Sequence, residues 1–140
     1  CLKIYMKTIY VLNESIEIDA TAFAINSHEK DYKLCWHINK GLSTYLKKER
    51  EARHISKKTF TNFTTKFEGR HISLIKNQSK GGFLMPQKKN IDYFMIIEPR
   101  LNSLYKEQFV QKLNKVSKIL LTFEIDLNSE PEAHRLIFND

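Results

Sequence analysis

The strongest constraint on the fold is a run of seven residues, IDYFMII, at positions 91–97. The run is the most apolar stretch of the chain, yet it is too short for a helix of ordinary length, so it predicts a central strand. Residues 77–90, which contain two glycines and a proline, precede the run and predict a flexible loop. Pro99 is expected to end the strand, because proline has no N–H to donate to a neighbouring strand.

A strand and an amphipathic helix are predicted towards the N-terminus. TAFAIN, residues 21–26, is expected to be a short strand, and Ser27 is placed to cap the helix that follows. Helical spacing of the next apolar residues predicts one buried face. These residues are Cys35, Ile38, Leu42, Tyr45 and Leu46. Gly41 is expected to shorten the helix, because glycine is a poor helix former.

A hairpin is predicted in the middle of the chain. Residues 47–58 are charged and lack strong periodicity, so they are expected to be a connection. Residues 63–67 alternate apolar and polar side chains, as in a half-buried strand, and 68–70 form a tight turn. HISLIKN, residues 71–77, returns as the second strand of the hairpin.

A second helix and a last strand complete the predicted order. Asn102 or Ser103 is placed to cap a helix whose apolar stripe has spacings of four, four and three residues. The stripe consists of Tyr105, Phe109, Leu113 and Val116. KILLTFEI, residues 118–125, predicts the last strand. The order β-α-β-β-β-α-β favours an α+β sandwich, with an antiparallel sheet of about five strands and both helices on one face. A ferredoxin-like arrangement with one inserted strand is the closest named pattern.

The length of 140 residues predicts one domain. The domain is expected to span residues 6–140, with Met6 as the natural start and residues 1–5 as upstream residues that are not native. An acylated Cys1, as in a bacterial lipoprotein, is the alternative, but the residues after it are apolar rather than a polar tether. Two cysteines, no signal peptide and no membrane-spanning run favour the cytoplasm.

MPQKKNIDY, residues 85–93, resembles the signature of the IPExxxVDY family, small proteins of Bacteroidota. The matching residues are Pro86, Asp92 and Tyr93. Met85 and Ile91 are apolar replacements, and Gln87 stands where the family has a glutamate. The resemblance extends to residues 24–42, with Asp31 and Tyr32 in place of a second DY pair, and to FMIIE and the closing RLIF. The spacing of the Asp31-Tyr32 pair also fits a start at Met6.

The resemblance implies no particular activity, because the family has no established one, and a glutamine in the motif cannot ionise. The residues themselves favour a structural role over a ligand site. Pro86 suits the entry to a strand. Asp92 is placed to accept N–H groups of a loop or to pair with Lys88 or Lys89, and Tyr93 to bury its ring and bond through its hydroxyl. The motif is therefore predicted to be a fold-specifying junction.

Positive charge is concentrated in the middle of the chain. The formal net charge is +7, and residues 40–90 alone hold thirteen Lys and Arg against three acidic residues. Such a segment is typical of a surface for an anionic partner such as RNA. The candidate contacts are Lys57, Lys58, Lys66, Arg70, Lys76, Lys88 and Lys89, and the candidate stacking aromatics are Phe60, Phe63, Phe67 and Tyr93. The alternative is a solvated lysine face, because the composition is biased towards Lys, Ile and Asn as in AT-rich genomes.

Trp36 lies off the apolar stripe of its helix and is the candidate contact with a protein partner. A wider stripe would make it part of the core instead. No HExxH, CxxC or paired-carboxylate pattern is present, so no metal or cofactor is expected. Cys35 is expected to be a small buried residue rather than a nucleophile. SKGG, residues 79–82, lacks the spacing of a phosphate loop.

The expected function is that of a non-enzymatic binding domain. It would contact RNA or a protein complex through the basic middle segment and an open sheet face. The alternative is a small-ligand regulatory module that acts as a dimer, with its site formed at the dimer interface from loop 77–90 and the strand ends. An enzyme is the least favoured class, because no motif supports one.

Overall fold

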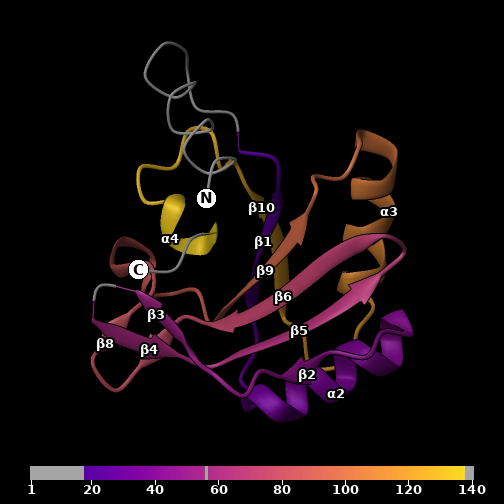
Figure 1. Cartoon of the computed structure of the whole chain (residues 1–140). Helices are drawn as coiled ribbons and strands as arrows, with labels where there is room; N and C mark the ends of the chain where they lie inside the picture. The colour runs from indigo at the N-terminus through magenta and orange to yellow at the C-terminus, as the bar shows by residue number, and fades with distance from the viewer. Residues whose placement is uncertain (1–17, 56, 138–140) are drawn as a thin grey trace.

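The computed structural model describes residues 18–55 and 57–137 and shows an α+β fold (Figure 1). The strands of its six-stranded antiparallel sheet are β1 (Thr21–Asn26), β2 (Lys47–Lys48), β5 (Asn62–Phe67), β6 (Arg70–Lys76), β9 (Tyr93–Glu98) and β10 (Leu121–Ile125). Two small hairpins pair β3 (Arg53–Ile55) with β4 (Lys58–Phe60) and β7 (Gln78–Ser79) with β8 (Gly82–Phe83). The helices of the described chain are α2 (Asp31–Leu42), α3 (Ser103–Asn114) and α4 (His134–Ile137), with a 3-10 turn, η1, at Pro86–Lys88. The predictions about Cys1 and Met6 lie outside the described residues.

The apolar run lies in the middle of the sheet, as predicted. The strand order is β10-β1-β9-β6-β5-β2, so β9 pairs antiparallel with β1 on one side and with β6 on the other. Five successive side chains of β9, from Tyr93 to Ile97, are buried. β9 ends at Glu98, directly before Pro99.

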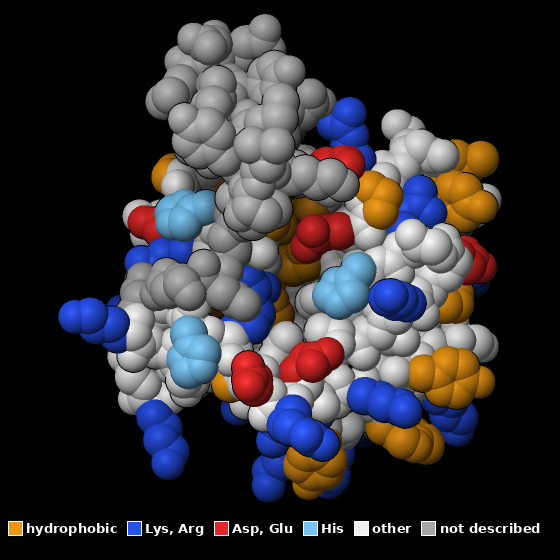
Figure 2. Space-filling view, viewed as in Figure 1, with side chains coloured by type: hydrophobic (Ala, Val, Ile, Leu, Met, Phe, Trp, Pro, Cys, Tyr) orange, Lys and Arg blue, Asp and Glu red, His pale blue; other side chains and the backbone are white. Residues whose placement is uncertain are grey.

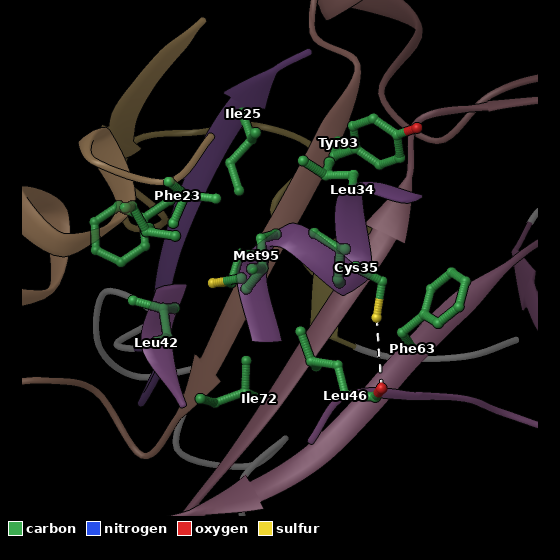
Figure 3. Close-up of a cluster of buried hydrophobic side chains, with 14 of the residues drawn as sticks. Phe23, Ile25, Leu34, Cys35, Leu42, Leu46, Phe63, Ile72, Tyr93 and Met95 are labelled. Carbon is green, nitrogen blue, oxygen red and sulfur yellow. Dashed lines mark hydrogen bonds between the residues drawn. The ribbon is translucent and has the colours of Figure 1, made fainter. Parts of the chain in front are cut away.

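One face of the sheet packs against α2 and α3 (Figure 1). Figure 3 shows side chains of β1, β6 and β9 pointing towards α2 in this first core. The sheet residues are Phe23, Ile25, Ile72, Leu74, Tyr93, Met95 and Ile97, and the helical ones include Leu34, Cys35, Ile38, Leu42 and Leu113. Both helices therefore cover the same face, as predicted.

The other face of the sheet is also covered, so the predicted open face is wrong. Ala22, Ala24, Phe94 and Ile96 point into a second buried cluster on this side. Their partners from outside the sheet are Ile55, Phe60, Leu84, Met85, Ile91, Leu127, Ala133 and Leu136. The covering segments include the charged connection and the loop expected from the sequence, which instead form β2, β3, β4, β7, β8 and η1.

The first helix begins and ends later in the chain than its cap and glycine suggest. Its N-cap is Lys30, and the Ser27 hydroxyl instead accepts a hydrogen bond of 3.1 Å from the Glu29 N–H. α2 continues through Gly41, where an added Cβ would lie 2.9 Å from Val116 Cγ2. A glycine at this position allows α2 to approach the segment that follows α3. Tyr45 lies beyond the helix and is 77% exposed, so its predicted burial is wrong.

The second helix begins as predicted, at Ser103 with Asn102 as its cap. The Asn102 Oδ1 accepts a 2.9 Å hydrogen bond from the Tyr105 N–H. Phe109 stacks on Phe23, with ring centres 5.8 Å apart, and Leu113 is fully buried. Tyr105 is 47% exposed, so the buried stripe begins one turn later than predicted. Within the described residues, each helix is too short or too polar to cross a bilayer.

We expect truncation of Leu113 to test the packing of α3. Leu113→Ala should lower the free energy of unfolding by about 2–5 kcal/mol, because it leaves a cavity in the first core. Leu104→Ala on the same helix is the control; this side chain is 65% exposed. Its cost should stay within about 0.5 kcal/mol. Urea unfolding measures both, and equal costs would contradict the packing.

Candidate functional site

Asp92 joins the entry of β9 to two neighbouring strands. Its Oδ2 accepts a 3.0 Å hydrogen bond from the Ser27 N–H, just after β1. Its own N–H donates to Asn26 Oδ1 at 3.3 Å, and its carbonyl accepts from the Asn77 N–H at 3.0 Å. The Asp92 carboxylate thus accepts one N–H group, that of Ser27 in the connection between β1 and α2.

The lysines proposed as ion-pair partners of Asp92 have other contacts. Lys88 Nζ lies 3.4 Å from Glu130 Oε2, and Lys89 Nζ lies 5.7 Å from the centre of the Phe83 ring. The Asp92 carboxylate is therefore held by the backbone N–H of Ser27. That arrangement is typical of a structural carboxylate near a strand end.

Tyr93 anchors the connection between β1 and α2. Its ring is buried and its hydroxyl donates a 2.6 Å hydrogen bond to the Glu29 carbonyl. Burial raises the pKa of the Tyr93 phenol well above its ordinary value, and the negative charges of Asp31 and Asp92 raise it further. The phenol therefore keeps its proton and remains a donor. The two DY pairs of the sequence lie close enough for the charge of one to act on the other.

Asn77 has an extensive structural role that the sequence did not single out. It is fully buried, and its Nδ2 donates to the carbonyls of Lys88 (2.9 Å) and Ile91 (2.8 Å). Its Oδ1 accepts from the Met85 N–H at 2.9 Å, and its carbonyl accepts from the Leu84 N–H at 2.7 Å. One side chain thus holds the segment 84–91 against the sheet. An asparagine within a polar loop gives no sequence signal of such a role.

Pro86 starts the 3-10 turn η1 instead of leading directly into a strand as expected. A fixed φ and a missing N–H suit the first position of a helical turn. The residue before it, Met85, is buried in the second core. Gln87 is exposed and lies on this turn.

A hollow of about 340 Å³ lies beside this junction. Its walls come from the connection between β1 and α2, the end of β6, the β7–β8 hairpin and the entry of β9. Three lysines line it, Lys30, Lys76 and Lys89, together with the ring of Phe83. The hollow therefore combines cationic groups with an aromatic side chain.

The electrostatic balance of the hollow favours an anion. Glu29 and Asp92 are the acidic residues that line it, against three lysines. The Asp92 carboxylate already accepts the Ser27 N–H, which partly satisfies its charge. The N-terminal end of α2 also faces this region, and its helix dipole is positive there.

The remaining basic candidates do not form one surface with the hollow. Lys66 and Arg70 flank the turn of the β5–β6 hairpin, and the Arg70 guanidinium lies 5.6 Å from the centre of the Tyr105 ring. Lys76 is at the opposite end of β6, about 20 Å away at the rise of a β-strand. Figure 2 accordingly shows Lys and Arg side chains spread over this face of the molecule.

Lys57 and Lys58 lie at the β3–β4 turn, outside the lining of the hollow. Lys58 runs past Gly81 and Gly82, where an added Cβ would meet its side chain at 3.2 Å in each case. Gly82 also has φ +142°, a backbone angle that residues with a side chain rarely adopt. Lys58 therefore packs against the β7–β8 hairpin.

The aromatic candidates for base stacking are inside the protein. Phe60, Phe63 and Tyr93 are 1%, 6% and 3% exposed, so the prediction that they stack on bases is wrong. Phe67 is half-buried against the first core. Alternating aromatics on a strand face the sheet core here, because both faces of the sheet are covered.

Trp36 is 57% exposed and lies off the buried stripe of α2, so it is not part of the core. Tyr32, one turn earlier on the helix, is equally exposed. Lys40 Nζ lies 5.0 Å from the centre of the Trp36 ring. This aromatic pair is separate from the hollow.

Cys35 is a buried residue of the first core, as predicted. Its Sγ donates to the Leu46 carbonyl at 3.4 Å, which Figure 3 shows as a dashed line. Burial raises the pKa of its thiol to about 11, which disfavours the reactive thiolate. Among the described residues, His, Cys, Asp and Glu side chains form no group of three or more that could hold a metal ion.

Comparison of the chain with protein-family models, curated proteins and solved structures finds no match. The hollow beside Asp92 and Tyr93 is the candidate site that the geometry provides. Of the sequence candidates, it brings together Lys76, Lys89, Asp92 and Tyr93. Lys30 and Phe83 are the lining residues that the sequence did not single out.

We expect Asn77→Ala to destabilise the protein by about 2–4 kcal/mol, because it leaves buried backbone groups of segment 84–91 without partners. Asn90→Ala is the matched control, since Asn90 is exposed in the same segment. Its cost should stay within about 0.5 kcal/mol. Urea unfolding gives both values, and hydrogen exchange should show a faster Met85 amide in Asn77→Ala. An unchanged Met85 amide would contradict the role of Asn77.

We expect Tyr93→Phe to cost about 0.5–1.5 kcal/mol at neutral pH, because it removes the hydrogen bond to Glu29. The native phenol has a raised pKa, so above about pH 10 it holds its proton while the unfolded chain loses it. The stability advantage of the wild type should therefore shrink as pH rises through that range. Unfolding at several pH values measures this. Tyr45→Phe is the exposed control, and an equal pH trend in that variant would contradict the interpretation.

Proposed function

We propose that this chain is a non-enzymatic binding domain for a small phosphorylated ligand, held in the hollow beside Asp92 and Tyr93. The observation that supports it is the convergence of Lys30, Lys76 and Lys89 around one hollow at the strand ends. These lysines come from segments that are far apart in the sequence. The proposal follows the small-ligand alternative of the sequence analysis, in place of an RNA-binding surface.

A phosphate is the group that this lining suits best. Lysine ammonium groups are strong donors to phosphate oxygens, and charged hydrogen bonds contribute more than neutral ones. α2 begins directly after the lining residue Lys30, and the positive end of its helix dipole is offset in part by the Asp31 carboxylate in its first turn. The Phe83 ring, which also lines the hollow, offers an apolar surface for a flat ring attached to the phosphate.

The RNA alternative has weaker support from the same geometry. The expected sheet face is covered, and three of its four expected stacking aromatics are buried. The basic residues divide between the hollow and the tip of the β5–β6 hairpin. An RNA surface would need these groups to act over one continuous groove.

The fold is proposed to be of the ferredoxin-like class. Two observations support this arrangement. α3 connects β9 to β10 with β1 between them, and α2 leads from β1 towards β6 with β9 between them. The α3 connection is a split β-α-β unit. The α2 connection would be the second one, with β2, β3, β4 and β5 inserted between α2 and β6.

The relation to the IPExxxVDY family is also kept as a proposal. Its support is that the segments carrying the resemblance meet in space. The hydroxyl of Tyr93 bonds to Glu29, two residues before Asp31, and the charge of Asp31 acts on Tyr93. The family and this chain would then have in common the junction at which the entry of β9 contacts the start of α2.

We expect pyrophosphate and AMP to shift the amide resonances of residues 27–30, 83 and 89 in a heteronuclear NMR titration. The double variant Lys76→Gln/Lys89→Gln should weaken binding by at least about tenfold, the ratio that corresponds to 1.4 kcal/mol. Lys66→Gln is the control, because Lys66 lies at the turn of the β5–β6 hairpin, at the opposite end from Lys76. This variant should bind the probes as tightly as the wild type.

Two outcomes would contradict the proposal. One is the absence of shifts in the hollow with either probe at low salt, where surface charge acts most strongly. The other is an equal loss of binding in the Lys66→Gln control. Binding of a single-stranded RNA oligonucleotide that depends on Lys66 and Arg70, and not on Lys76, would instead support the RNA surface.

A further inference from the structure

The two edges of the sheet differ in how they are protected. The edge strand β2 has two residues, Lys47 and Lys48, both exposed. A short edge with lysines is a common way to prevent pairing with another sheet. The opposite edge, β10, is five residues long and has β1 as its neighbour within the described chain. It has neither lysine nor proline within Leu121–Ile125.

The β10 edge also exposes apolar side chains. Leu121 and Phe123 are 52% and 39% exposed, and Leu120, which precedes the strand, is 61% exposed. Phe123 lies opposite Ala24, and Leu121 opposite Asn26, on the face of the second core. The cover of that face ends at Ile125, which is buried. Among residues 18–55 and 57–137, the half of β10 that precedes Ile125 therefore combines a strand edge without a second partner strand with exposed apolar side chains.

We propose that β10 is a homodimer interface, in which two copies pair β10 with β10 antiparallel about a two-fold axis. The six-stranded sheets then join into one continuous sheet. With Thr122 on the axis, Leu121 of each copy faces Phe123 of the second copy on the same face of the sheet. Directly opposed aliphatic and aromatic side chains are favourable cross-strand pairs. An isologous contact of this kind is closed and produces a dimer, not a fibre.

The charges around β10 select the antiparallel direction. Lys115 and Lys118 precede the strand, whereas Glu124 and Asp126 lie at its C-terminal end, and all four are exposed. The Glu124 carboxylate also lies 3.2 Å from Lys106 Nζ of its own chain, so Asp126 is the acidic group that a second copy would meet first. Antiparallel pairing places the basic end of one copy beside the acidic end of the other. Parallel pairing would place like charges together. This complementarity identifies a second copy of the chain as the partner.

The interface is independent of the proposed ligand site, because it shares no residue with the lining of the hollow. Its failure would thus leave the ligand proposal untouched. The test compares the whole chain with the variant Leu121→Lys/Phe123→Lys, which places on β10 the residue type that β2 carries. Leu104→Lys is the matched control, since Leu104 is an exposed leucine on α3.

Sedimentation equilibrium over a concentration series should show a dimer for the wild type and for Leu104→Lys. In the double variant, the dissociation constant of the dimer should be at least about 100-fold higher than in the wild type. Its circular dichroism should match the wild type, which separates loss of the interface from loss of the fold. Hydrogen exchange should show amides of β10 that lose protection on dilution.

Three results would overturn the interface. The first is a wild type that stays monomeric at about 0.5 mM, a concentration roughly 500-fold above a dissociation constant of about 1 μM. A double variant that dimerises as tightly as the wild type is the second. The third is protection of every β10 amide that does not change with concentration, which would mean that the edge is covered within one chain.

Discussion

Burial of β9 on both faces of the sheet depends on full hydrogen bonding at its entry. A buried strand leaves no water for the backbone groups where it begins, so each must find a partner in the protein. Asp92 and Asn77 supply these partners by bonding to the ends of β1 and β6 and to segment 84–91. Without these hydrogen bonds, backbone N–H and C=O groups at the entry of β9 would be buried without partners. Both cores depend on β9, because its side chains point alternately into the one and the other.

The parts of the fold that have a sequence signal over several residues were predictable. β9 is a continuous apolar run, β5 alternates apolar and polar side chains, and the capped helix α3 has apolar residues at helical spacing. The strands β2, β3, β4, β7 and β8 have two or three residues each, too few to show a period. Burial of Phe60 and Leu84 depends on contacts with distant strands, and this is why the second face was expected to be open.

The candidate site was predictable for Asp92 and Tyr93, because their place at the entry of an apolar strand is visible in the sequence. Their partners are nevertheless far away in the chain, at Ser27 and Glu29. Asn77 bonds to backbone groups of the segment that follows it, but no sequence pattern marks that segment as buried. The grouping of the basic residues on the surface was not predictable. Lys66 and Lys76 are near in sequence, yet an antiparallel hairpin places them at its two ends. Charge density along a sequence therefore says little about charge density on a surface.

Segment 84–91 has two surfaces with different tasks. Leu84, Met85 and Ile91 fill the second core, while Lys89 lines the hollow together with one side of Ile91. Movement of this wall to admit a larger molecule would expose buried leucine and methionine to water. The hollow is thus expected to be rigid, and to discriminate among molecules by size and by charge placement instead of adapting its shape to them.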